Sequence, residues 1–264
     1  MPAGMGGSQD VPCCMAAGWG KSLLMILAID AGNTRVKWGL YQRGAWLAQG
    51  AVANVDMVRL AEAWRPFPVP NQVIISNVAG QKARSALTVL ISHWHKEATW
   101  VTPTAAEGGV INRYARPAQL GSDRWAALVA ARHLHGGSCL VVGIGTAVTC
   151  DVLTKEGEFL GGIILPSPDL MFDVLARRTA SVAPAKGTLQ RFPTSTADGV
   201  FTGAWLAVAG AIDRMFRATM ETEGGNVLCI LHGGDAEVLR PLLNIPLRVE
   251  DNLVLGGLIQ LAQA

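Results

Sequence analysis

The stretch ILAIDAGNTRVKWGLYQRGAWLAQGAVA, residues 26–53, alternates apolar segments with two turns of small and polar residues. Its first apolar segment reaches Asp30, and a turn with Gly32 follows at once. Apolar and polar residues that alternate between glycine-containing turns are typical of β-strands. The pattern predicts three consecutive strands, over residues 23–30, 34–41 and 45–53.

The same pattern returns in the second half of the chain, as CLVVGIGTAVTCDVLTKEGEFLGGIILP at residues 139–166. Each copy has an apolar strand, a turn with glycine and threonine, a second strand, a charged glycine turn and a third strand. Two such units, each followed by alternating helices and strands, indicate an internal duplication within an α/β protein. With Gly32 aligned on Gly145, Asp30 stands opposite Gly143, so only the first turn has a carboxylate at this place.

The rest of the chain continues this alternation of helices and strands. We expect helices at 55–65, 81–97, from Ser122 onward, 168–178, 198–223 and 235–243, and strands at 72–78, 98–102 and 226–231. Pro66 should end the first of these helices. The duplication predicts an N-terminal domain at 23–121 and a C-terminal domain at 122–264. Residues 1–22 show no periodicity and are expected to be a disordered extension.

Composition narrows the class of protein. Half of the 264 residues are hydrophobic and the net charge is +2, without a basic run that would favour nucleic acid or an anionic membrane. No segment has the roughly 20 apolar residues of a membrane span. The five cysteines are an odd number without metal-ligand spacing, which favours reduced thiols in a cytoplasmic protein.

The first turn has two interpretations. Asn, Asp and Gly are common at the tip of an ordinary hairpin. Alternatively, the backbone N–H groups of the turn bind phosphate oxygens, Lys37 supplies a positive charge, and Asp30 binds a hydrated Mg²⁺. The similar turn GIGTA, at 143–147, favours the second interpretation, because two such turns facing one another could hold a nucleoside triphosphate from both sides.

A second group of polar residues lies in INRYARPAQLGSDRW, residues 111–125. Ser122 is a suitable N-cap, and Asp123 would then complement the dipole of the helix. The alternative is catalytic: Asp123 accepts a proton from a substrate hydroxyl, while Arg124 holds an anionic group of the substrate near Tyr114. The helix terminus should keep Asp123 ionised.

Two further signals are weaker. Thr196, just before the helix at 198–223, is either a helix cap or a polar ligand of the substrate. The segment LHGGDAEVL, residues 231–239, is a strand-to-helix turn that is either routine or in contact with a phosphate or nucleoside.

The motifs DAGNTRVK, LGSDRW, GTAVTCD, GEFLGGIILP and LHGGDA, in this order, resemble the type III pantothenate kinase family over residues from about 24 to the C-terminus. The resemblance implies two ribonuclease-H-like domains of the actin-like ATPase superfamily, with mixed sheets flanked by helices and a cleft between them. It also implies ATP-dependent phosphorylation of pantothenate to 4′-phosphopantothenate, the first step of coenzyme A biosynthesis. The alternatives are a kinase of another small alcohol and a nucleotide-binding accessory protein with weak or lost kinase activity.

Site residues follow from the same resemblance. It implies that ATP and Mg²⁺ contact Asp30, Ala31, Gly32, Asn33, Thr34, Arg35, Val36, Lys37 and Thr146, with Asp30 facing the metal. It implies Asp123 as the general base, and Tyr114, Gly121, Ser122, Asp123, Arg124 and Thr196 as residues that bind pantothenate. Members of the family are homodimers that share part of the pocket. The family also binds K⁺ or NH₄⁺ through an acid where this chain has Gly143, so that site is either lost or supplied by another group.

Overall fold

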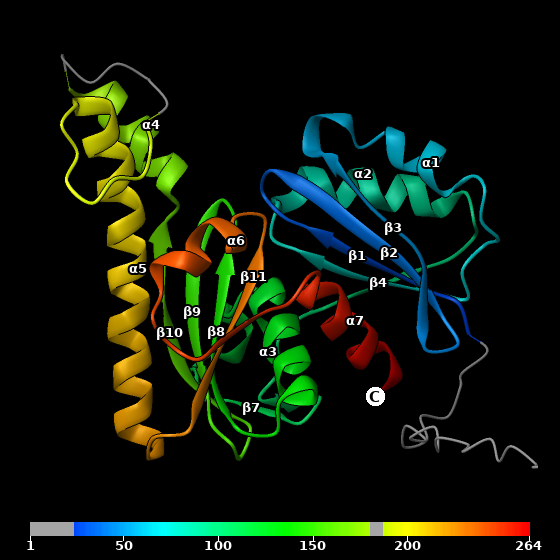
Figure 1. Cartoon of the computed structure of the whole chain (residues 1–264). Coiled ribbons are helices and arrows are strands. Elements are labelled where there is room, and N and C mark those ends of the chain that lie inside the picture. Colours follow the sequence, from blue (N-terminus) through cyan, green and yellow to red (C-terminus); the bar gives the residue numbers. More distant parts are fainter. Residues whose placement is uncertain (1–23, 180–186) are drawn as a thin grey trace, which may run out of the picture.

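The two copies of the strand pattern form two sheets that are connected in the same order (Figure 1). The structure is a computed structural model that describes residues 24–179 and 187–264; the extension expected at 1–22 lies outside the described residues. The order is β3-β2-β1-β4-β5 in the first sheet and β12-β11-β8-β9-β10-β7-β6 in the second. Within the second sheet, the order β10-β9-β8-β11-β12 corresponds to the order β3-β2-β1-β4-β5 of the first sheet. This correspondence confirms the duplication.

The strands of the first sheet are β1 (Ile26–Ala31), β2 (Arg35–Gln42), β3 (Ala45–Ala53), β4 (Gln72–Asn77) and β5 (Ala98–Trp100). Those of the second are β6 (Ala106–Glu107), β7 (Val110–Asn112), β8 (Ser138–Ile144), β9 (Ala147–Leu153), β10 (Glu158–Pro166), β11 (Val227–Gly233) and β12 (Leu247–Val249). In each sheet the first three strands of the repeat are antiparallel, and the last two join in parallel. Both sheets are therefore mixed, as expected.

The helices are α1 (Arg59–Trp64), α2 (Gly80–Ser92), α3 (Ser122–Leu134), α4 (Pro168–Arg178), α5 (Thr196–Glu223), α6 (Ala236–Leu239) and α7 (Leu253–Gln263), with short 3-10 turns at Asn54–Asp56, Pro117–Gln119 and Arg240–Leu242. The helix predicted at 81–97 ends at Ser92, because His95 adopts a left-handed backbone with φ of 52°. The helix predicted at 55–65 is shorter too, with no side-chain cap at its N-terminus.

The segment before α3 belongs partly to the second sheet. Strand β7 pairs in parallel with β10, and β6 pairs with β7, although both precede residue 121. Conversely, α7 follows that residue but packs near β1 and β4 of the first sheet. The division of the chain at residue 121 stays a prediction, because each sheet receives elements from the other side of it.

Helices α3 and α7 lie between the two sheets (Figure 1). One buried cluster joins Ile26 of β1, Trp125 of α3, Val141 of β8 and Leu258 of α7. The two helices are in close contact, because a Cβ on Gly257 of α7 would lie 1.8 Å from the carbonyl oxygen of Ala126 in α3. The sheets therefore share one hydrophobic core through this helix pair.

Two other clusters cover the outer faces of the sheets. Leu27, Trp38, Trp64 and Leu87 belong to the cluster on the outer face of the first sheet, under α1 and α2. Helix α5 packs on the outer face of the second sheet, through a cluster that includes Trp205. None of the helices within the described ranges combines the length and the apolar character that a membrane span requires.

Candidate active site

The turn between β1 and β2 is held in shape by a residue that follows β3. The side-chain amide of Asn54 donates to the carbonyl oxygens of Gly32 and Asn33, both at 2.8 Å. Gly32 N–H donates to the carbonyl oxygen of Arg35 at 3.1 Å, so the turn is tight. Asn33, Thr34 and Arg35 are exposed at its tip, where backbone N–H groups and small polar side chains are free to meet a ligand.

The two repeated turns meet one another. The hydroxyl oxygen of Thr34, in the first turn, lies 2.7 Å from that of Thr146, in the second turn, at hydrogen-bond distance. Both side chains are exposed. The structure therefore brings together the two glycine-containing turns that the sequence predicts to hold a nucleoside triphosphate.

Asp30 ends up beside groups of opposite and like charge. Strand register places it opposite Lys37 on β2 and Ser76 on β4. Burial and the charge of Asp123 raise the pKa of Asp30 to about 7, against the opposing effects of Lys37 and of a hydrogen bond from Ser76. Its Oδ1 atom is buried without a hydrogen-bond partner among the described residues. An orphaned carboxylate oxygen of this kind fits a divalent cation such as Mg²⁺.

Helix α3 begins differently from the prediction. Gly121, not Ser122, is the N-cap, and no side chain caps this helix. The hydroxyl of Ser122 instead accepts from the backbone N–H of Asn77 at 3.1 Å and lies 3.0 Å from the hydroxyl of Ser76. These bonds attach the start of α3 to the end of β4, next to Asp30. Ser122 therefore has a tertiary role, which local propensity cannot reveal.

Asp123 folds back over the helix start. Its Oδ1 accepts from the backbone N–H of Arg124 at 2.8 Å, and a Cβ on Gly121 would lie 2.5 Å from the same oxygen. Burial raises the pKa of Asp123, while the backbone N–H and the charge of Arg124 lower it in part. The helix terminus thus favours the ionised form, as expected, but burial outweighs it and the net shift is upward.

Arg124 is buried and already paired. Its Nε donates to Oδ2 of Asp151 at 3.0 Å, and its Nη2 donates to Oδ1 of the same carboxylate. Nη1 donates to the Tyr114 hydroxyl at 3.3 Å. Tyr114 and Arg124, predicted as partners on one substrate, are thus in contact. Asp151 is a member of this group that the sequence pattern did not indicate.

Gly143 faces a histidine from the neighbouring strand. His232 on β11 is paired with Gly143 in the parallel register of β11 and β8. A Cβ added at position 143 would lie 2.9 Å from Nε2 of His232 and 3.0 Å from the hydroxyl oxygen of Thr149. Burial and the charge of Lys37 lower the pKa of His232 to about 4, so the imidazole is neutral near pH 7. The ring occupies space that an acidic side chain would need.

Thr196 lies apart from this group. It is the first residue of α5, on the opposite face of the second sheet from α3 (Figure 1). The cap of α5 is Ser195, whose hydroxyl accepts from the backbone N–H of Asp198 at 3.2 Å, so the interpretation of Thr196 as the cap is wrong. Its side chain is exposed.

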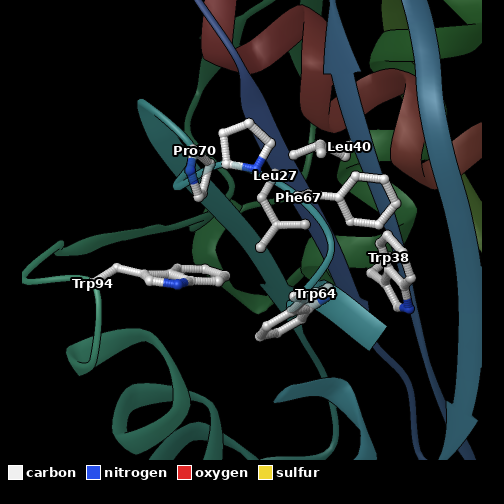
Figure 2. A pocket seen from close by; sticks show the side chains of 8 residues that line it. Leu27, Trp38, Leu40, Trp64, Phe67, Pro70 and Trp94 are labelled. Carbon is white, nitrogen blue, oxygen red and sulfur yellow. The ribbon is translucent and has the colours of Figure 1, made fainter. Parts of the chain in front are cut away.

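One small cavity among the described residues is not part of this site. It lies in the aromatic cluster on the outer face of the first sheet, between Leu27, Trp38, Trp64 and Trp94 (Figure 2). Its volume is about 10 Å³, which is room for about one water molecule. The tryptophans here pack against one another, with 5.3 Å between the ring centroids of Trp64 and Trp94.

Comparison with known proteins identifies the family. A family model described as type III pantothenate kinase matches residues 26–218. The type III pantothenate kinase of Nitrosospira multiformis is 48% identical over 239 residues, covering 90% of this chain and 91% of that protein. The enzyme of the same name from Aromatoleum aromaticum is 45% identical, covering 90% of this chain and 98% of that protein.

Solved structures share the fold at low identity. A protein described as a Baf-family transcriptional activator from Campylobacter jejuni has a TM-score of 0.59 at 17% identity, covering 90% of this chain and 97% of that one. A 2-dehydro-3-deoxygalactonokinase from Sinorhizobium meliloti has a TM-score of 0.54 at 18% identity, covering 90% and 98%. The matching strand order of the two sheets, the paired turns and these structural similarities all indicate the same fold. The chain belongs to the type III pantothenate kinase family and has its duplicated α/β fold.

Proposed function

We infer that this chain is an ATP-dependent pantothenate kinase, which forms 4′-phosphopantothenate in the first step of coenzyme A biosynthesis. Membership of the family carries this conclusion. The site supplies what phosphoryl transfer requires, namely a phosphate-binding turn, a carboxylate for a divalent metal and a carboxylate for the acceptor hydroxyl. Nothing within the described residues favours the alternative of an accessory protein without turnover. We place the reaction in the cytoplasm, in keeping with the buried free thiols of Cys139, Cys150 and Cys229.

ATP is proposed to bind between the two turns. The backbone of Gly32, Asn33 and Thr34 would contact the phosphates, and Thr146 would close the site from the second turn. Side chains of this segment cannot all take part: those of Ala31 and Val36 are buried in the core of the first sheet. For these two residues, any contact with ATP is through the backbone.

Asp30 and Lys37 are proposed to act on the charge of the triphosphate. The unpartnered Oδ1 of Asp30 suits Mg²⁺, which in such enzymes neutralises phosphate charge when bound. Lys37, opposite Asp30 in the strand register, adds a fixed positive charge on the same side.

Asp123 is proposed to take the proton from the pantothenate hydroxyl. It lies at the start of α3, close enough to Asp30 for the two carboxylates to influence one another. Burial raises the pKa of Asp123, which brings a general base closer to the operating pH. Gly121 leaves room for the carboxylate, and Ser122 fixes the helix start on β4. Tyr114 and Arg124 would hold the rest of the substrate.

The test is a coupled ATP and pantothenate assay of the intact protein. Asp123→Asn should lower kcat by about 10²–10⁴-fold with little change in the KM for ATP, as expected for loss of a general base. Asp56→Asn, at an exposed carboxylate in the first domain, is the matched control. Undiminished turnover by Asp123→Asn would exclude the role as base.

The monovalent cation is proposed to be dispensable. The imidazole of His232 lies where an acid at position 143 would project, and it is a neutral ring near pH 7. Of the two alternatives, the loss of the cation site is the one that this packing supports.

The protein is proposed to act as a homodimer in which Thr196 completes the partner's pocket. Thr196 lies on the outer side of the second sheet, away from Tyr114 and Asp123 of its own chain. Large apolar side chains are exposed on the helices of this side, among them Val174 of α4 at 57% and Leu206 of α5 at 51%. A contiguous exposed apolar surface is typical of a subunit interface.

Subunit mixing tests this arrangement. If Thr196 serves the partner's site, Asp123→Asn and Thr196→Ala proteins should each be impaired, and their mixture should regain activity, because one site of the mixed dimer is then intact. A mixture no more active than the mean of its components would contradict the shared pocket.

A further inference from the structure

The Arg124 guanidinium is held by a carboxylate from the second repeated hairpin. Asp151, on β9, accepts from both Nε and Nη2 of Arg124. The side chains are only 8% and 3% exposed. Planar, two-point pairing of this kind fixes the direction of a guanidinium more firmly than a single contact would.

The strand beside Asp151 is shaped for this ion pair. Gly162 of β10 is paired with Asp151 in the antiparallel register. A Cβ on Gly162 would lie 2.2 Å from Oδ1 of Asp151 and 3.1 Å from Nη2 of Arg124. The same Cβ would lie 2.3 Å from the carbonyl oxygen of Cys150, so any larger residue at this position would displace the ion pair and the adjacent backbone of β9.

Aromatic rings fix the guanidinium from another side. The rings of Tyr114 and Phe159 each lie 5.9 Å from its central carbon. The two rings contact one another at 5.2 Å, and the Tyr114 hydroxyl accepts from Nη1. The guanidinium is thus confined by a carboxylate from β9, a ring from β10 and a ring from the loop after β7.

Asp151 also determines which carboxylate forms an ion pair with the Arg124 guanidinium. Asp123 is adjacent in sequence but is reached by Arg124 through its backbone N–H, at 2.8 Å. The side chain of Arg124 goes to Asp151 instead. A guanidinium paired with Asp123 would neutralise the proposed base and lower its pKa. Pairing with Asp151 keeps the guanidinium from forming an ion pair with the Asp123 carboxylate.

We propose that Asp151 is a positioning residue for phosphoryl transfer, which holds Arg124 against Tyr114 and away from Asp123, and that Gly162 provides the space for this ion pair. The inference rests on the roles proposed above for Arg124 and Asp123. Asp151 touches neither substrate nor ATP in this scheme. Its effect on the reaction passes through Arg124.

A double-mutant cycle on kcat/KM for pantothenate is the direct test. Arg124→Gln alone should lower kcat/KM at least 10-fold, and so should Asp151→Asn alone. In the Arg124→Gln background, Asp151→Asn should change kcat/KM less than threefold, because Asp151 then has no guanidinium to position. The KM for ATP should stay within threefold throughout, which a general loss of structure would not allow.

The same set of variants includes a control for loss of folding. Asp151→Asn leaves Arg124 buried without a counter-charge and could unfold the protein. The double variant Arg124→Gln with Asp151→Asn has a neutral amide pair and avoids this cost. If Asp151→Asn is unfolded, Gly162→Ala tests the positioning of Arg124 instead, and a change of more than threefold between Arg124→Gln and the double variant would show that Asp151 acts by another route.

Gly162 gives an independent variant with a matched control. Gly162→Ala should reduce kcat/KM for pantothenate at least 10-fold. Gly136→Ala, in the exposed turn after α3 where a Cβ meets nothing within 4 Å, should leave it unchanged. If Gly162→Ala unfolds the protein, the double-mutant cycle on Arg124 and Asp151 is the test of the positioning role.

The outcomes separate this inference from the proposed function. If Arg124→Gln itself retains full kcat/KM, the role proposed for Arg124 is wrong. If Arg124→Gln is impaired but Asp151→Asn is not, or if the two effects multiply in the double variant, Asp151 does not act through Arg124 and the positioning role is overturned.

Discussion

The Thr34 and Thr146 hydroxyls, 112 residues apart in the chain, lie 2.7 Å from one another across the two repeated turns. This contact joins the halves of the duplication at the point where each turn is exposed. A ligand held by both turns would replace or extend it. Substitution of either threonine therefore tests whether the two turns bind a ligand.

Thr146→Val should raise the KM for ATP by about 3–30-fold and leave the KM for pantothenate nearly unchanged. The substitution keeps the shape of the side chain but removes a hydroxyl whose hydrogen bonds contribute about 0.5–1.5 kcal/mol each. Initial-rate kinetics with ATP as the varied substrate measure the effect. Thr88→Val is the control, since Thr88 bonds only the carbonyl oxygen of Arg84 within its own helix. An unchanged KM for ATP would show that the second turn does not contact the nucleotide.

The stability of the nucleotide-free protein should fall between about pH 4 and pH 7 because of Asp30. Its pKa is about 7 in the folded protein and 3.8 in a model peptide, so in this range only the folded state retains the proton. Stability is then lost as pH rises, by up to about 4 kcal/mol at about 1.4 kcal/mol per pH unit.

Asp30→Asn removes this titration, so its unfolding free energy should depend less on pH than that of the unaltered protein. Urea unfolding of both proteins at pH 5 and pH 8 gives the comparison, with Asp56→Asn as the exposed control. Equal pH dependence in all three proteins would mean that Asp30 is ionised throughout this range.

Kinase activity should be the same, within about twofold, in KCl, NH₄Cl and NaCl of equal ionic strength. The reason is that Gly143 offers no carboxylate and His232 fills the adjacent space as a neutral ring. The coupled assay in the three salts measures it. A large and saturable activation by K⁺ alone would show that another group of the chain supplies the cation site.

Gly257→Ala should destabilise the protein by about 1–3 kcal/mol or more. A Cβ at this position would lie 1.8 Å from the carbonyl oxygen of Ala126, so α7 and α3 would have to move apart. Gly256→Ala is a matched control in the same helix, because its Cβ would lie 4.0 Å from Ala130; it should be neutral or stabilising by up to about 1 kcal/mol. Urea denaturation measures both, and equal stabilities would contradict the close helix contact.

The repeated hairpins could be predicted from the sequence to within a few residues. Their signal is local: apolar residues alternate along the strands, and glycine marks each turn. The elements that were missed depend on tertiary context. Helix α7 is apolar on most of its surface, with Leu253, Leu255 and Leu258 all buried, because it lies between two sheets. It therefore lacks the one-sided periodicity by which a helix is recognised.

The sequence pattern suggested site residues only where several polar residues stand in one continuous segment. The turn after Asp30 and the segment that contains Asp123 are of this kind. Asp151 and His232 were not predicted as site residues, because each sits in a strand and acquires its role only from a partner on another element. A buried ion pair between residues 27 positions apart has no sequence period to reveal it.

The core that α3 and α7 form between the sheets has a consequence for how the protein unfolds. In a duplicated chain, two domains with separate cores can unfold one after the other. Here Ile26 of the first sheet and Val141 of the second belong to one buried cluster with these helices, so exposing either sheet removes the support of the other. Denaturation should follow a single cooperative transition, and neither half of the duplication should be stable when expressed alone.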